Sequence, residues 1–360
     1  TVRISGDFRM APAGDKRILV THQPIGVSLL ITPWNFPAGM ATRKIGPAVA
    51  AGCTMILKPA GETPLTALAI VDILERCGLP KGVLNVILPP QSGPAISKVL
   101  HDPRVKNLSF TGSTQVGKIL LKEAADQVIR CSMELGGNAP FVVLADANVE
   151  EAVKGLMMAK MRNGGAACTA ANRIYVARSI GDKFIAEFAK AMAALKMGVG
   201  REAGTQLGAS VSVKERNKIA ELVDASKARG AKVHLGGATP DGAGAFYPAT
   251  VLEVSQDDEI LANEVFGPVA PIVLFDTDEE ALKLANDTEY GLISYVYSED
   301  LKRAIRFAEG LEAGMVGINR GLLSDPAAPF GGVKQSGLGR EGGFDGVHEF
   351  LQTKYIGVEI

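Results

Sequence analysis

The sequence predicts an α/β protein with two units, each built around a parallel sheet. From residue 25 onward, short runs rich in Val, Ile and Leu alternate with longer helical patterns, and this alternation is typical of repeated βα units. The glycine pair Gly136-Gly137 interrupts the alternation, which then resumes. The chain has 360 residues, 47% of them hydrophobic, so it can bury a large core, and its length favours two domains over one.

The first unit, over residues 25–136, is expected to be an open α/β domain. Its expected strands cover 26–31, 54–58, 83–88, 105–110 and 128–134. One helix is expected over 64–77, because five apolar residues form a single stripe there and Gly78 and Pro80 follow as stop signals. The stripe consists of Leu65, Leu68, Ile70, Ile73 and Leu74.

The second unit, over residues 137–336, repeats the pattern after the glycine pair, which has the composition of a hinge. We expect, in order, a strand over 140–144, a helix over 149–161, a strand over 173–177 and a helix over 182–195. Glycine-rich stretches over 236–245 and 331–343 predict surface loops.

The two ends of the chain belong to neither expected core. Residues 6–24 and 352–360 carry alternating, strand-like patterns. Edge strands of this kind commonly pair with another subunit, so they predict a homo-oligomer, a homodimer or a homotetramer.

Charge and hydropathy exclude two classes of partner. The net charge is −1, the isoelectric point is near 6.4 and the positive charges are scattered, so nucleic acid is not an expected partner. No apolar run approaches the roughly 20 residues that cross a bilayer, and the N-terminal residues do not resemble a leader. We therefore predict a cytoplasmic protein with no membrane partner.

The four cysteines are widely spaced and form no metal-binding pattern with histidine, so no metal is expected. Free thiols in a reducing compartment are the simplest interpretation. For Cys53, Cys77 and Cys131, which stand in helical or strand patterns, we expect small buried hydrophobic residues.

Cys168 is the candidate nucleophile. It lies in a run of small residues between an expected helix ending at Arg162 and an expected strand, and Gly164-Gly165 lets backbone approach a substrate closely. Only the thiolate is nucleophilic, so the site must lower the thiol pKa from about 8.5. The alternative for any lone cysteine is a buried structural thiol.

Two further residues complete a candidate covalent-catalysis site. Asn35 follows a strand and is held between two prolines, so its amide is suited to donate to a developing oxyanion; the alternative is a turn asparagine that bonds its own backbone. Glu134 ends an apolar strand, where α/β sheets place their ligands, and it is the candidate general base for water. The alternative is a carboxylate that caps a loop.

Residues 110–117 follow a strand and open a helix, an arrangement in which N-terminal amides of the helix hold phosphate. The segment lacks the usual Gly-x-Gly-x-x-Gly pattern, so alone it is a weak nucleotide signal. Lys58, at a strand end, adds a cation for ribose hydroxyls or phosphate; the alternative is a solvated lysine.

Taken together, these segments resemble the aldehyde dehydrogenase superfamily, in the same order and over nearly the whole chain. Seven segments carry the resemblance: Pro33-Trp34-Asn35-Phe36-Pro37, Leu57-Lys58-Pro59-Ala60, Phe110-Thr111-Gly112-Ser113, Glu134-Leu135-Gly136-Gly137, the Cys168 run, Glu264-Val265-Phe266-Gly267-Pro268 and Pro329-Phe330-Gly331-Gly332. The resemblance implies an open Rossmann-type cofactor domain over 25–136, an α/β catalytic domain over 137–336 and a small β oligomerisation element. Family members carry a helical segment ahead of residue 1, so it also implies that the N-terminal part of the cofactor domain is missing.

The resemblance implies NAD(P)-dependent oxidation of an aldehyde to a carboxylate. Cys168 would attack the aldehyde to give a thiohemiacetal, with its oxyanion held by Asn35 and by the cysteine's own N–H. Glu134 would activate the water that hydrolyses the resulting thioester, and Lys44 would help polarise the network.

The resemblance also implies the cofactor contacts. Glu264 would hold the nicotinamide ribose and Phe266 would wall the nicotinamide pocket. The other implied contacts are Thr32, Pro33, Trp34, Lys58, Ala60, Gly61, Phe110, Gly112, Ser113 and Leu135.

Within the superfamily, residues 31–44 and 331–342 most resemble succinate-semialdehyde dehydrogenases. Arg43 and Arg162 stand where these enzymes place cations for the distal carboxylate of the substrate, and Ser324 matches a hydroxyl that assists them. Arginine binds carboxylate in a bidentate manner, which suits a dicarboxylic semialdehyde; ordinary salt bridges are the alternative. Glutarate or 2-oxoglutarate semialdehyde is an alternative substrate, and a non-catalytic relative is an alternative of another class.

Three residues depart from the family pattern. Ala166 stands two residues before the nucleophile, where Gln or Glu is usual. Gly61 replaces an acidic residue that NAD-preferring members use for ribose hydroxyls, which favours NADP as the cofactor with NAD still usable, although Glu62 follows directly. Ala170 stands where some succinate-semialdehyde dehydrogenases have a second cysteine, so that redox switch is absent.

Overall fold

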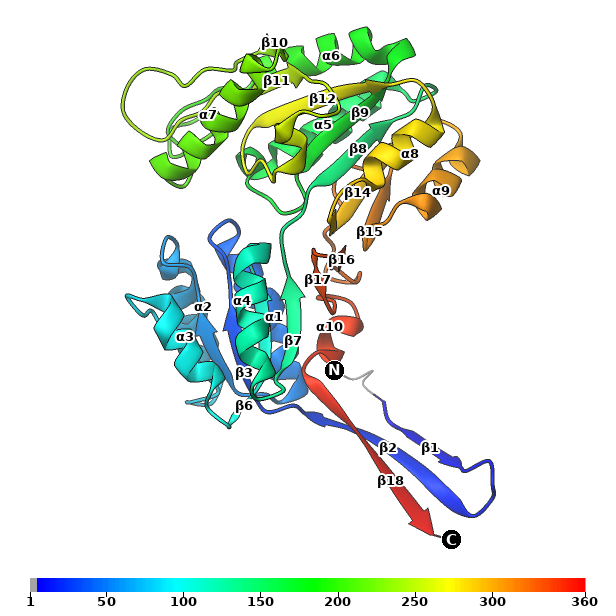
Figure 1. Ribbon diagram of the computed structural model, residues 1–360. Helices are drawn as coiled ribbons and strands as arrows, with labels where there is room; N and C mark the ends of the chain where they lie inside the picture. The colour runs from blue at the N-terminus through cyan, green and yellow to red at the C-terminus, as the bar shows by residue number, and fades with distance from the viewer. Residues whose placement is uncertain (1–4, 360) are drawn as a thin grey trace. The chain divides into compact units, whose positions relative to one another are not determined.

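The computed structural model describes residues 5–359, which form two compact units (Figure 1). The first unit contains the chain up to Leu135, the segment Asp325–Gly331 and the chain from Gly337 onward. The second contains Gly136–Ser324 and Gly332–Ser336. The chain therefore returns to the first unit near its end. None of the described helices is long and apolar enough to span a membrane.

The first unit contains a six-stranded sheet with the strand order β17-β7-β6-β3-β4-β5. Its strands are β3 (Val27–Ile31), β4 (Met55–Lys58), β5 (Leu84–Val86), β6 (Val105–Thr111), β7 (Arg130–Glu134) and β17 (Gly337–Leu338). The short β17 is antiparallel to β7, and the other neighbours are parallel. The chain runs outward from β3 to β5 and then returns to β6, on the other side of β3.

Helices on both faces of this sheet explain why most residues of its central strands β3 and β6 are buried. The helices are α1 (Pro37–Ala51), α2 (Pro64–Arg76), α3 (Ser92–Leu100), α4 (Thr114–Ala125) and the short α10 (Asp345–His348). Successive residues of β3 point to opposite faces. Leu30 belongs to a buried cluster with Ile45 of α1, whereas Leu29 belongs to a second cluster with Ile96 of α3 and Leu120 of α4.

The apolar stripe expected over 64–77 is only partly correct. The helix is present as α2, but Leu65 is 76% exposed and Leu68 and Ile73 are also exposed. Ala67 is buried, and Ile70 packs against the same core cluster. The buried face is therefore narrower than the apolar pattern, because only one edge of α2 reaches the sheet.

The two ends of the described chain form a separate three-stranded antiparallel sheet. Its order is β1 (Asp7–Met10), β2 (Lys16–Pro24) and β18 (Leu351–Glu359). The central β2 pairs with β18 over its whole length, from Leu351 opposite Pro24 to Glu359 opposite Lys16. Apolar side chains remain exposed on this sheet, namely Phe8, Met10, Tyr355, Ile356 and Val358.

The second unit contains a seven-stranded sheet with the order β10-β11-β12-β9-β8-β14-β15. Only β10 is antiparallel to its neighbour. The strands are β8 (Ala139–Val143), β9 (Ala171–Ala177), β10 (Lys232–Leu235), β11 (Thr250–Glu253), β12 (Val269–Phe275), β14 (Ile293–Tyr297) and β15 (Met315–Ile318). A small ladder joins β13 (Tyr290–Gly291) to β16 (Val333–Lys334).

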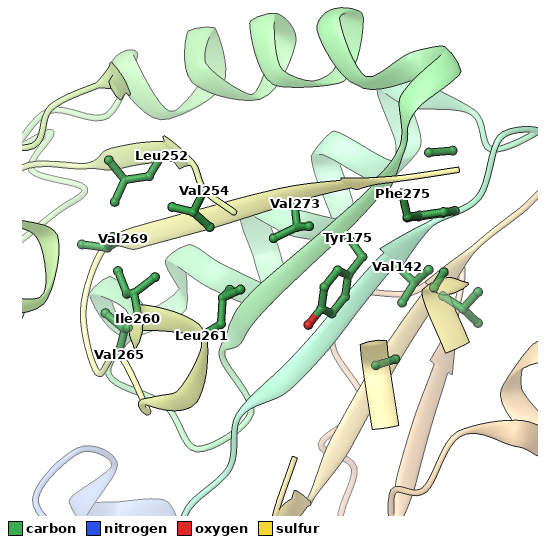
Figure 2. Close-up of a cluster of buried hydrophobic side chains, with 14 of the residues drawn as sticks. Val142, Tyr175, Leu252, Val254, Ile260, Leu261, Val265, Val269, Val273 and Phe275 are labelled. Carbon is green, nitrogen blue, oxygen red and sulfur yellow. The ribbon is translucent and has the colours of Figure 1, made fainter. Parts of the chain in front are cut away.

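The helices of this unit are α5 (Val149–Met161), α6 (Arg178–Ala193), α7 (Val213–Ala228), α8 (Asp278–Asn286) and α9 (Leu301–Gly310), with short helices η1 (Arg162–Gly165) and η2 (Glu259–Ala262). Between them and the sheet lies a continuous apolar core that includes Val142, Tyr175, Val273 and Phe275 (Figure 2). The core fixes the strands whose ends carry the site residues.

Helix α6 begins at Arg178, four residues before the expected start at 182. Gly181 belongs to the helix and is not a breaker. A Cβ at this position would lie 2.7 Å from Cδ2 of Leu274 in β12, so glycine allows the helix to pack close to the sheet. The sequence pattern does not distinguish a packing glycine from a terminating one.

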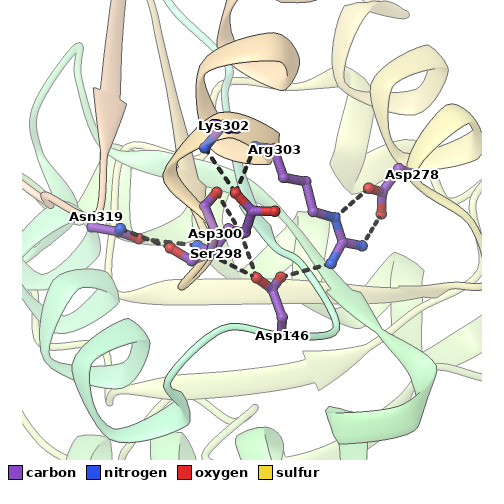
Figure 3. A network of polar contacts seen from close by, with 7 residues as sticks. All are labelled: Asp146, Asp278, Ser298, Asp300, Lys302, Arg303 and Asn319. Carbon is purple, nitrogen blue, oxygen red and sulfur yellow. Dashed lines mark hydrogen bonds and ion pairs between the residues drawn. The ribbon is translucent and has the colours of Figure 1, made fainter.

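Charged residues join the carboxyl ends of β8 and β14 to two helices (Figure 3). Asp146, which follows β8, accepts hydrogen bonds from Ser298 Oγ at 2.7 Å and from the backbone N–H of Asp300 at 2.9 Å. Arg303 of α9 donates to Asp146 at 2.7 Å and to Asp278 of α8 at 2.6 Å. The network lies at the carboxyl ends of these parallel strands. Cys168 lies at the opposite edge of the sheet, because it precedes β9.

Candidate active site

The carboxyl ends of four neighbouring parallel strands carry most of the predicted cofactor residues. The strands lie in the order β7-β6-β3-β4, so their carboxyl ends share one edge of the first unit's sheet. The direction of the chain reverses beside β3, and open α/β sheets bind ligands at such a switch point. The residues at this edge are Thr32, Pro33, Trp34, Lys58, Ala60, Gly61, Phe110, Gly112, Ser113 and Leu135.

The segment after β6 is built for a close approach to the N-terminus of α4. Ser113 is the N-cap of this helix, and its Oγ accepts from the N–H of Val116 at 3.4 Å. A Cβ at Gly112 would lie 2.5 Å from the ring of Phe110, so only glycine fits there. The backbone amides that open α4 suit a phosphate group.

Lys58 ends β4 and is half-buried. Burial lowers the pKa of its ammonium group, and the nearby carboxylate of Glu62 acts in the opposite direction. Glu62 is therefore within electrostatic reach of Lys58. The negative charge of Glu62 therefore offsets part of the positive charge of Lys58, which no acid at position 61 neutralises.

Glu134, the candidate general base, is the last residue of β7 and is 3% exposed. Neither oxygen of its carboxyl group has a hydrogen-bond partner among the described residues. Burial raises the pKa of this carboxyl group well above its ordinary value, and the carboxylate of Glu341 raises it further. The cations of Lys44, Arg43 and Arg340 act in the opposite direction. A carboxyl group in this environment takes up a proton readily, as a general base must.

The returning segment 325–331 approaches Glu134 closely. A Cβ at Gly331 would lie 2.7 Å from Oε1 of Glu134 and 2.8 Å from Cδ of Arg340. Glycine at this position therefore leaves space beside the carboxyl group. This gives a physical reason for the glycine in the Pro329-Phe330-Gly331-Gly332 segment.

Lys44 lies on α1 with a fully buried side chain. Its Nζ donates to Glu341 at 2.6 Å and to Ser109 Oγ of β6 at 2.9 Å. Lys44 and Glu134 were predicted as catalytic residues, and the electrostatic influence of Lys44 on Glu134 shows that the structure brings them together. Glu341, which joins them, was not predicted. The only signal in the sequence was its place in the 331–342 segment.

Arg43 lies next to Lys44 on α1. Its guanidinium carbon is 4.3 Å from the centre of the Phe330 ring, and its NH1 is 3.6 Å from Oε2 of Glu341. The predicted substrate cation is therefore also part of the cluster around Glu341.

Asn35 occupies the turn between β3 and α1, with a proline at the first position of the helix. Its Oδ1 accepts from the N–H of Phe36 at 3.1 Å. Because the side-chain oxygen is used locally, the amide nitrogen is the atom that can donate to an oxyanion.

In the second unit, Cys168 lies between η1 and β9, as expected, and its thiol is partly exposed. None of the four cysteines forms a disulfide bond. Cys53 is buried, as predicted, and Cys131 is partly exposed. The prediction for Cys77 is wrong: this residue is exposed, because it follows the end of α2, most of which faces solvent.

Side chains from two elements hold the run that carries Cys168. Asn163, with a positive φ of 56°, donates from its amide to the carbonyl of Ala166 at 3.2 Å. Arg162 donates to Thr169 Oγ1 at 3.3 Å, and the buried hydroxyl of Tyr295 donates to the carbonyl of Thr169 at 2.9 Å. The predicted substrate cation Arg162 is thus anchored to the residue that follows the nucleophile. Tyr295, on β14, was not predicted.

Gly137 joins Cys168 to the predicted ribose-binding residue. A Cβ at Gly137 would lie 2.5 Å from the carbonyl oxygen of Cys168, and its N–H donates to Oε1 of Glu264 at 3.2 Å. Burial raises the pKa of Glu264 to about 7, against the effects of Gly137 and Lys160. Cys168 and Glu264 are therefore neighbours through one glycine.

The structure thus gathers the predicted residues into two groups. Asn35, Arg43, Lys44 and Glu134, with the residues at the sheet edge, belong to the first unit, and the second group consists of Cys168, Arg162, Glu264, Phe266 and Ser324. No group of three or more His, Cys, Asp or Glu in the described part of the chain is arranged to hold a metal ion.

The profile of the aldehyde dehydrogenase family matches residues 2–356. The chain belongs to this family. It is therefore an oxidoreductase of a family that uses NAD(P), and the predicted family and α/β fold are confirmed.

Several relatives of this aldehyde dehydrogenase are named for aldehydes that carry an acid group. It is 53% identical to a succinate-semialdehyde dehydrogenase of Paenarthrobacter nicotinovorans, over 99% of this chain and 80% of the relative. It is 46% identical to a glutarate-semialdehyde dehydrogenase of Pseudomonas putida, over 99% of this chain and 74% of the relative. A succinate-semialdehyde dehydrogenase from Burkholderia pseudomallei superimposes with a TM-score of 0.97 at 46% identity, over 99% of this chain and 74% of that one.

Proposed function

We propose that this aldehyde dehydrogenase oxidises succinate semialdehyde to succinate through a covalent intermediate on Cys168. The observation that carries the proposal is the anchoring of Arg162 to Thr169, next to the nucleophile, at 3.3 Å. A guanidinium group at this place would bind a carboxylate on the substrate, and it offers nothing to an uncharged aldehyde.

In the first step, the thiolate of Cys168 attacks the aldehyde carbon. A C–S bond forms and the carbonyl electron pair moves onto oxygen. The amide of Asn35 and the backbone N–H of Cys168 donate to this oxyanion, and removal of one such donor typically lowers the rate about a hundredfold or more. When bound, the nicotinamide cofactor accepts the hydride that leaves the thiohemiacetal carbon, so that a thioester remains.

In the second step, Glu134 takes a proton from water, and the oxygen of that water attacks the thioester carbon. The C–S bond breaks, the carboxylate product leaves and Cys168 is regenerated as thiolate. The buried position of Glu134 supports this role, because its raised pKa favours proton uptake. Lys44, hydrogen-bonded to Glu341, is proposed to limit the rise of this pKa and so to keep a working fraction of Glu134 ionised.

For the cofactor, we propose that the amides at the start of α4, with Ser113 and Lys58, hold the phosphate and ribose groups, and that Glu264 and Phe266 hold the nicotinamide end. NADP is the proposed preference, with NAD also used, because no acid stands at Gly61 to repel a 2′-phosphate. A relative from Sinorhizobium fredii, 46% identical, is named as a probable NADP-dependent succinate-semialdehyde dehydrogenase. The negative charge of Glu62, which acts on Lys58, limits the preference for NADP.

Glutarate semialdehyde is the second candidate substrate, because relatives at 46% identity oxidise it by name. Arg43, Arg162 and Ser324 are the proposed ligands of the distal carboxylate in either case. Two arginines fix a carboxylate without measuring the length of the chain that carries it.

We also propose that the sheet of β1, β2 and β18 mediates assembly into a homodimer or homotetramer. Two of its strands are edges, and five apolar side chains on it are exposed. Light scattering of the wild-type chain and of Tyr355→Lys, which places a charge on the exposed side of β18, tests this. A single mass equal to the monomer for wild type would contradict it.

Steady-state kinetics test the proposed substrate. Succinate semialdehyde, glutarate semialdehyde and uncharged butanal are compared with both cofactors, using wild type, Arg162→Met and Arg162→Lys. We expect kcat/KM to be highest for succinate semialdehyde and to fall at least tenfold in Arg162→Met, with butanal unaffected. Because Arg162 also anchors Thr169 beside Cys168, a small loss for butanal is compatible with this role. Equal losses for butanal and for the acid-bearing substrates would contradict the role of Arg162, and no turnover with any aldehyde would contradict the activity.

A further inference from the structure

We infer that Lys160 is a positioning residue for the cofactor site, whose buried ammonium group keeps the Glu264 carboxylate ionised. The inference rests on the proposed function in one respect, namely that Glu264 binds the cofactor ribose. Lys160 itself has no part in the proposed chemistry.

The position of Lys160 requires an explanation. It lies on α5 and is fully buried. Its Nζ donates to Oδ1 of Asn172 on β9 at 2.8 Å and to the carbonyl oxygen of Val265 at 3.4 Å. A buried ammonium group is costly unless an opposite charge compensates it. Asn172 and the carbonyl of Val265 are both neutral, so these hydrogen bonds alone do not account for the buried charge.

The compensating charge is on the residue before Val265. Lys160 binds the carbonyl of Val265, so its ammonium group lies against the backbone next to Glu264. Glu264 in turn accepts from the N–H of Gly137 at 3.2 Å, and Gly137 contacts the Cys168 carbonyl. Lys160 thus contacts the segment that carries Glu264, the proposed ribose ligand.

Other charged groups on the neighbouring elements are directed elsewhere. Arg173 of β9 donates to the carbonyls of Asn138, Leu284 and Ala285. Arg162 of η1 donates to Thr169, and Asp258, next to η2, accepts from Ser226. Among the described residues, Glu264 is the acid whose charge acts on Lys160.

The two groups depend on each other. Burial lowers the pKa of Lys160 to about 7, and Glu264 acts against this. Burial raises the pKa of Glu264 to about 7, and Gly137 and Lys160 act against this. Without the charge of Lys160, only the hydrogen bond from the amide of Gly137 would still lower the pKa of Glu264. The carboxyl group would then keep its proton up to a higher pH. A neutral carboxyl group accepts hydrogen bonds from ribose hydroxyls less strongly than a carboxylate does.

The first experiment measures the pair without cofactor. Lys160→Gln removes the charge and keeps a donor for Asn172, and Lys160→Arg keeps the charge. Urea unfolding at pH 7, where Lys160 still carries its proton in part, is compared for wild type, Lys160→Gln, Glu264→Gln and the double variant. We expect Lys160→Gln to lower the midpoint clearly in the wild-type background and little in the Glu264→Gln background. Equal effects in both backgrounds would overturn the inference.

The second experiment measures the dissociation constant of NADP⁺ by calorimetry from pH 6 to pH 9. We expect Lys160→Gln to move the pH of half-maximal affinity up by about one unit, which is about a fivefold loss of affinity at pH 7, with kcat at saturating cofactor changed much less. Lys160→Arg should resemble wild type, and Lys160→Gln should have no further effect in Glu264→Gln. If Glu264→Gln weakens NADP⁺ binding, an unchanged pH profile in Lys160→Gln would overturn the inference.

These results also separate the inference from the proposed function. If unfolding shows coupling between Lys160 and Glu264, and Glu264→Gln leaves the affinity for NADP⁺ unchanged at every pH, then the lysine does keep the carboxylate ionised. In that case it is the proposed ribose contact of Glu264 that is lost.

Discussion

Lys44 and Glu341 are 297 residues apart in the sequence, and the Nζ of one lies 2.6 Å from the carboxylate of the other. Both side chains are buried. The charge of Lys44 lowers the pKa of Glu134, and the charge of Glu341 raises it. The ion pair therefore links the middle of α1 to the segment that returns to the first unit near the end of the chain. A change in this ion pair should therefore affect both the stability of the first unit and the proposed base catalysis by Glu134.

Replacement of Lys44 by methionine should destabilise the first unit. The substitution leaves the Glu341 charge buried with Arg43 at 3.6 Å as its remaining ion-pair contact, and breaking a buried pair typically costs about 3–5 kcal/mol. Urea unfolding measures this cost. Lys44→Met/Glu341→Gln should recover part of the loss, whereas Lys154→Met, which breaks two exposed pairs on α5, should change stability much less than Lys44→Met does. A double variant less stable than Lys44→Met would contradict this account.

Glu134→Gln should block hydrolysis of the thioester and spare the step before it. We expect kcat to fall about a hundredfold or more, because general-base catalysis typically contributes about 10²–10⁴-fold. Stopped-flow absorbance of the reduced cofactor should still show one fast turnover per active site. Loss of that first turnover together with kcat would mean that Glu134 serves an earlier step.

The rate of turnover should rise with pH through the raised pKa of Glu134, because only the ionised carboxylate takes a proton from water. Lys44→Met should move this rise to higher pH, since Lys44 lowers the same pKa. A pH profile of kcat for both proteins is the measurement. A shift to lower pH in the variant would have the wrong sign.

Stability should depend on pH in the opposite direction. The pKa of Glu134 in the folded chain lies above its ordinary value of 4.5, so the stability linked to its protonation is complete below that value and is lost as the pH rises through the folded pKa. Glu134→Gln cannot lose a proton there. Its melting temperature relative to wild type should therefore increase between pH 5 and pH 9, and a constant difference would contradict the burial argument.

Ala166 is expected to influence turnover, because it stands two residues from Cys168 in a run held by Asn163. Ala166→Gln and Ala166→Glu restore the side chains that are usual in the family. We expect kcat/KM to change in at least one variant with NADP or with NAD. Unchanged kinetics of both variants with both cofactors would remove this prediction.

Much of the fold could be predicted because its strands are covered on both faces. Leu29 and Leu30 are buried in different clusters, so β3 appears in the sequence as a continuous apolar run. Helix faces were less predictable: the sequence shows that Leu65 is apolar, but only the distance of α2 from the sheet decides that this side chain stays exposed. The same limit applies to Gly181, whose role depends on Leu274 in another strand.

Short motifs indicate the candidate site residues Cys168, Glu134 and Asn35, whose catalytic roles stay predictions. A residue whose role depends on a distant partner could not be predicted from the sequence. Glu341 is one acid in a glycine-rich stretch until Lys44 is placed beside it, and Lys160 follows a helical pattern in which lysine ordinarily faces solvent. Buried charges of this kind are determined by tertiary contacts alone.

Mass spectrometry of the trapped intermediate tests the central claim most directly. Glu134→Gln is mixed with succinate semialdehyde and NADP⁺, quenched in acid and digested. We predict a succinyl group on the peptide that contains Cys168, and no such adduct in Glu134→Gln/Cys168→Ser. The adduct on Cys53, Cys77 or Cys131, or reduced cofactor formed without any acylated cysteine, would contradict covalent catalysis by Cys168.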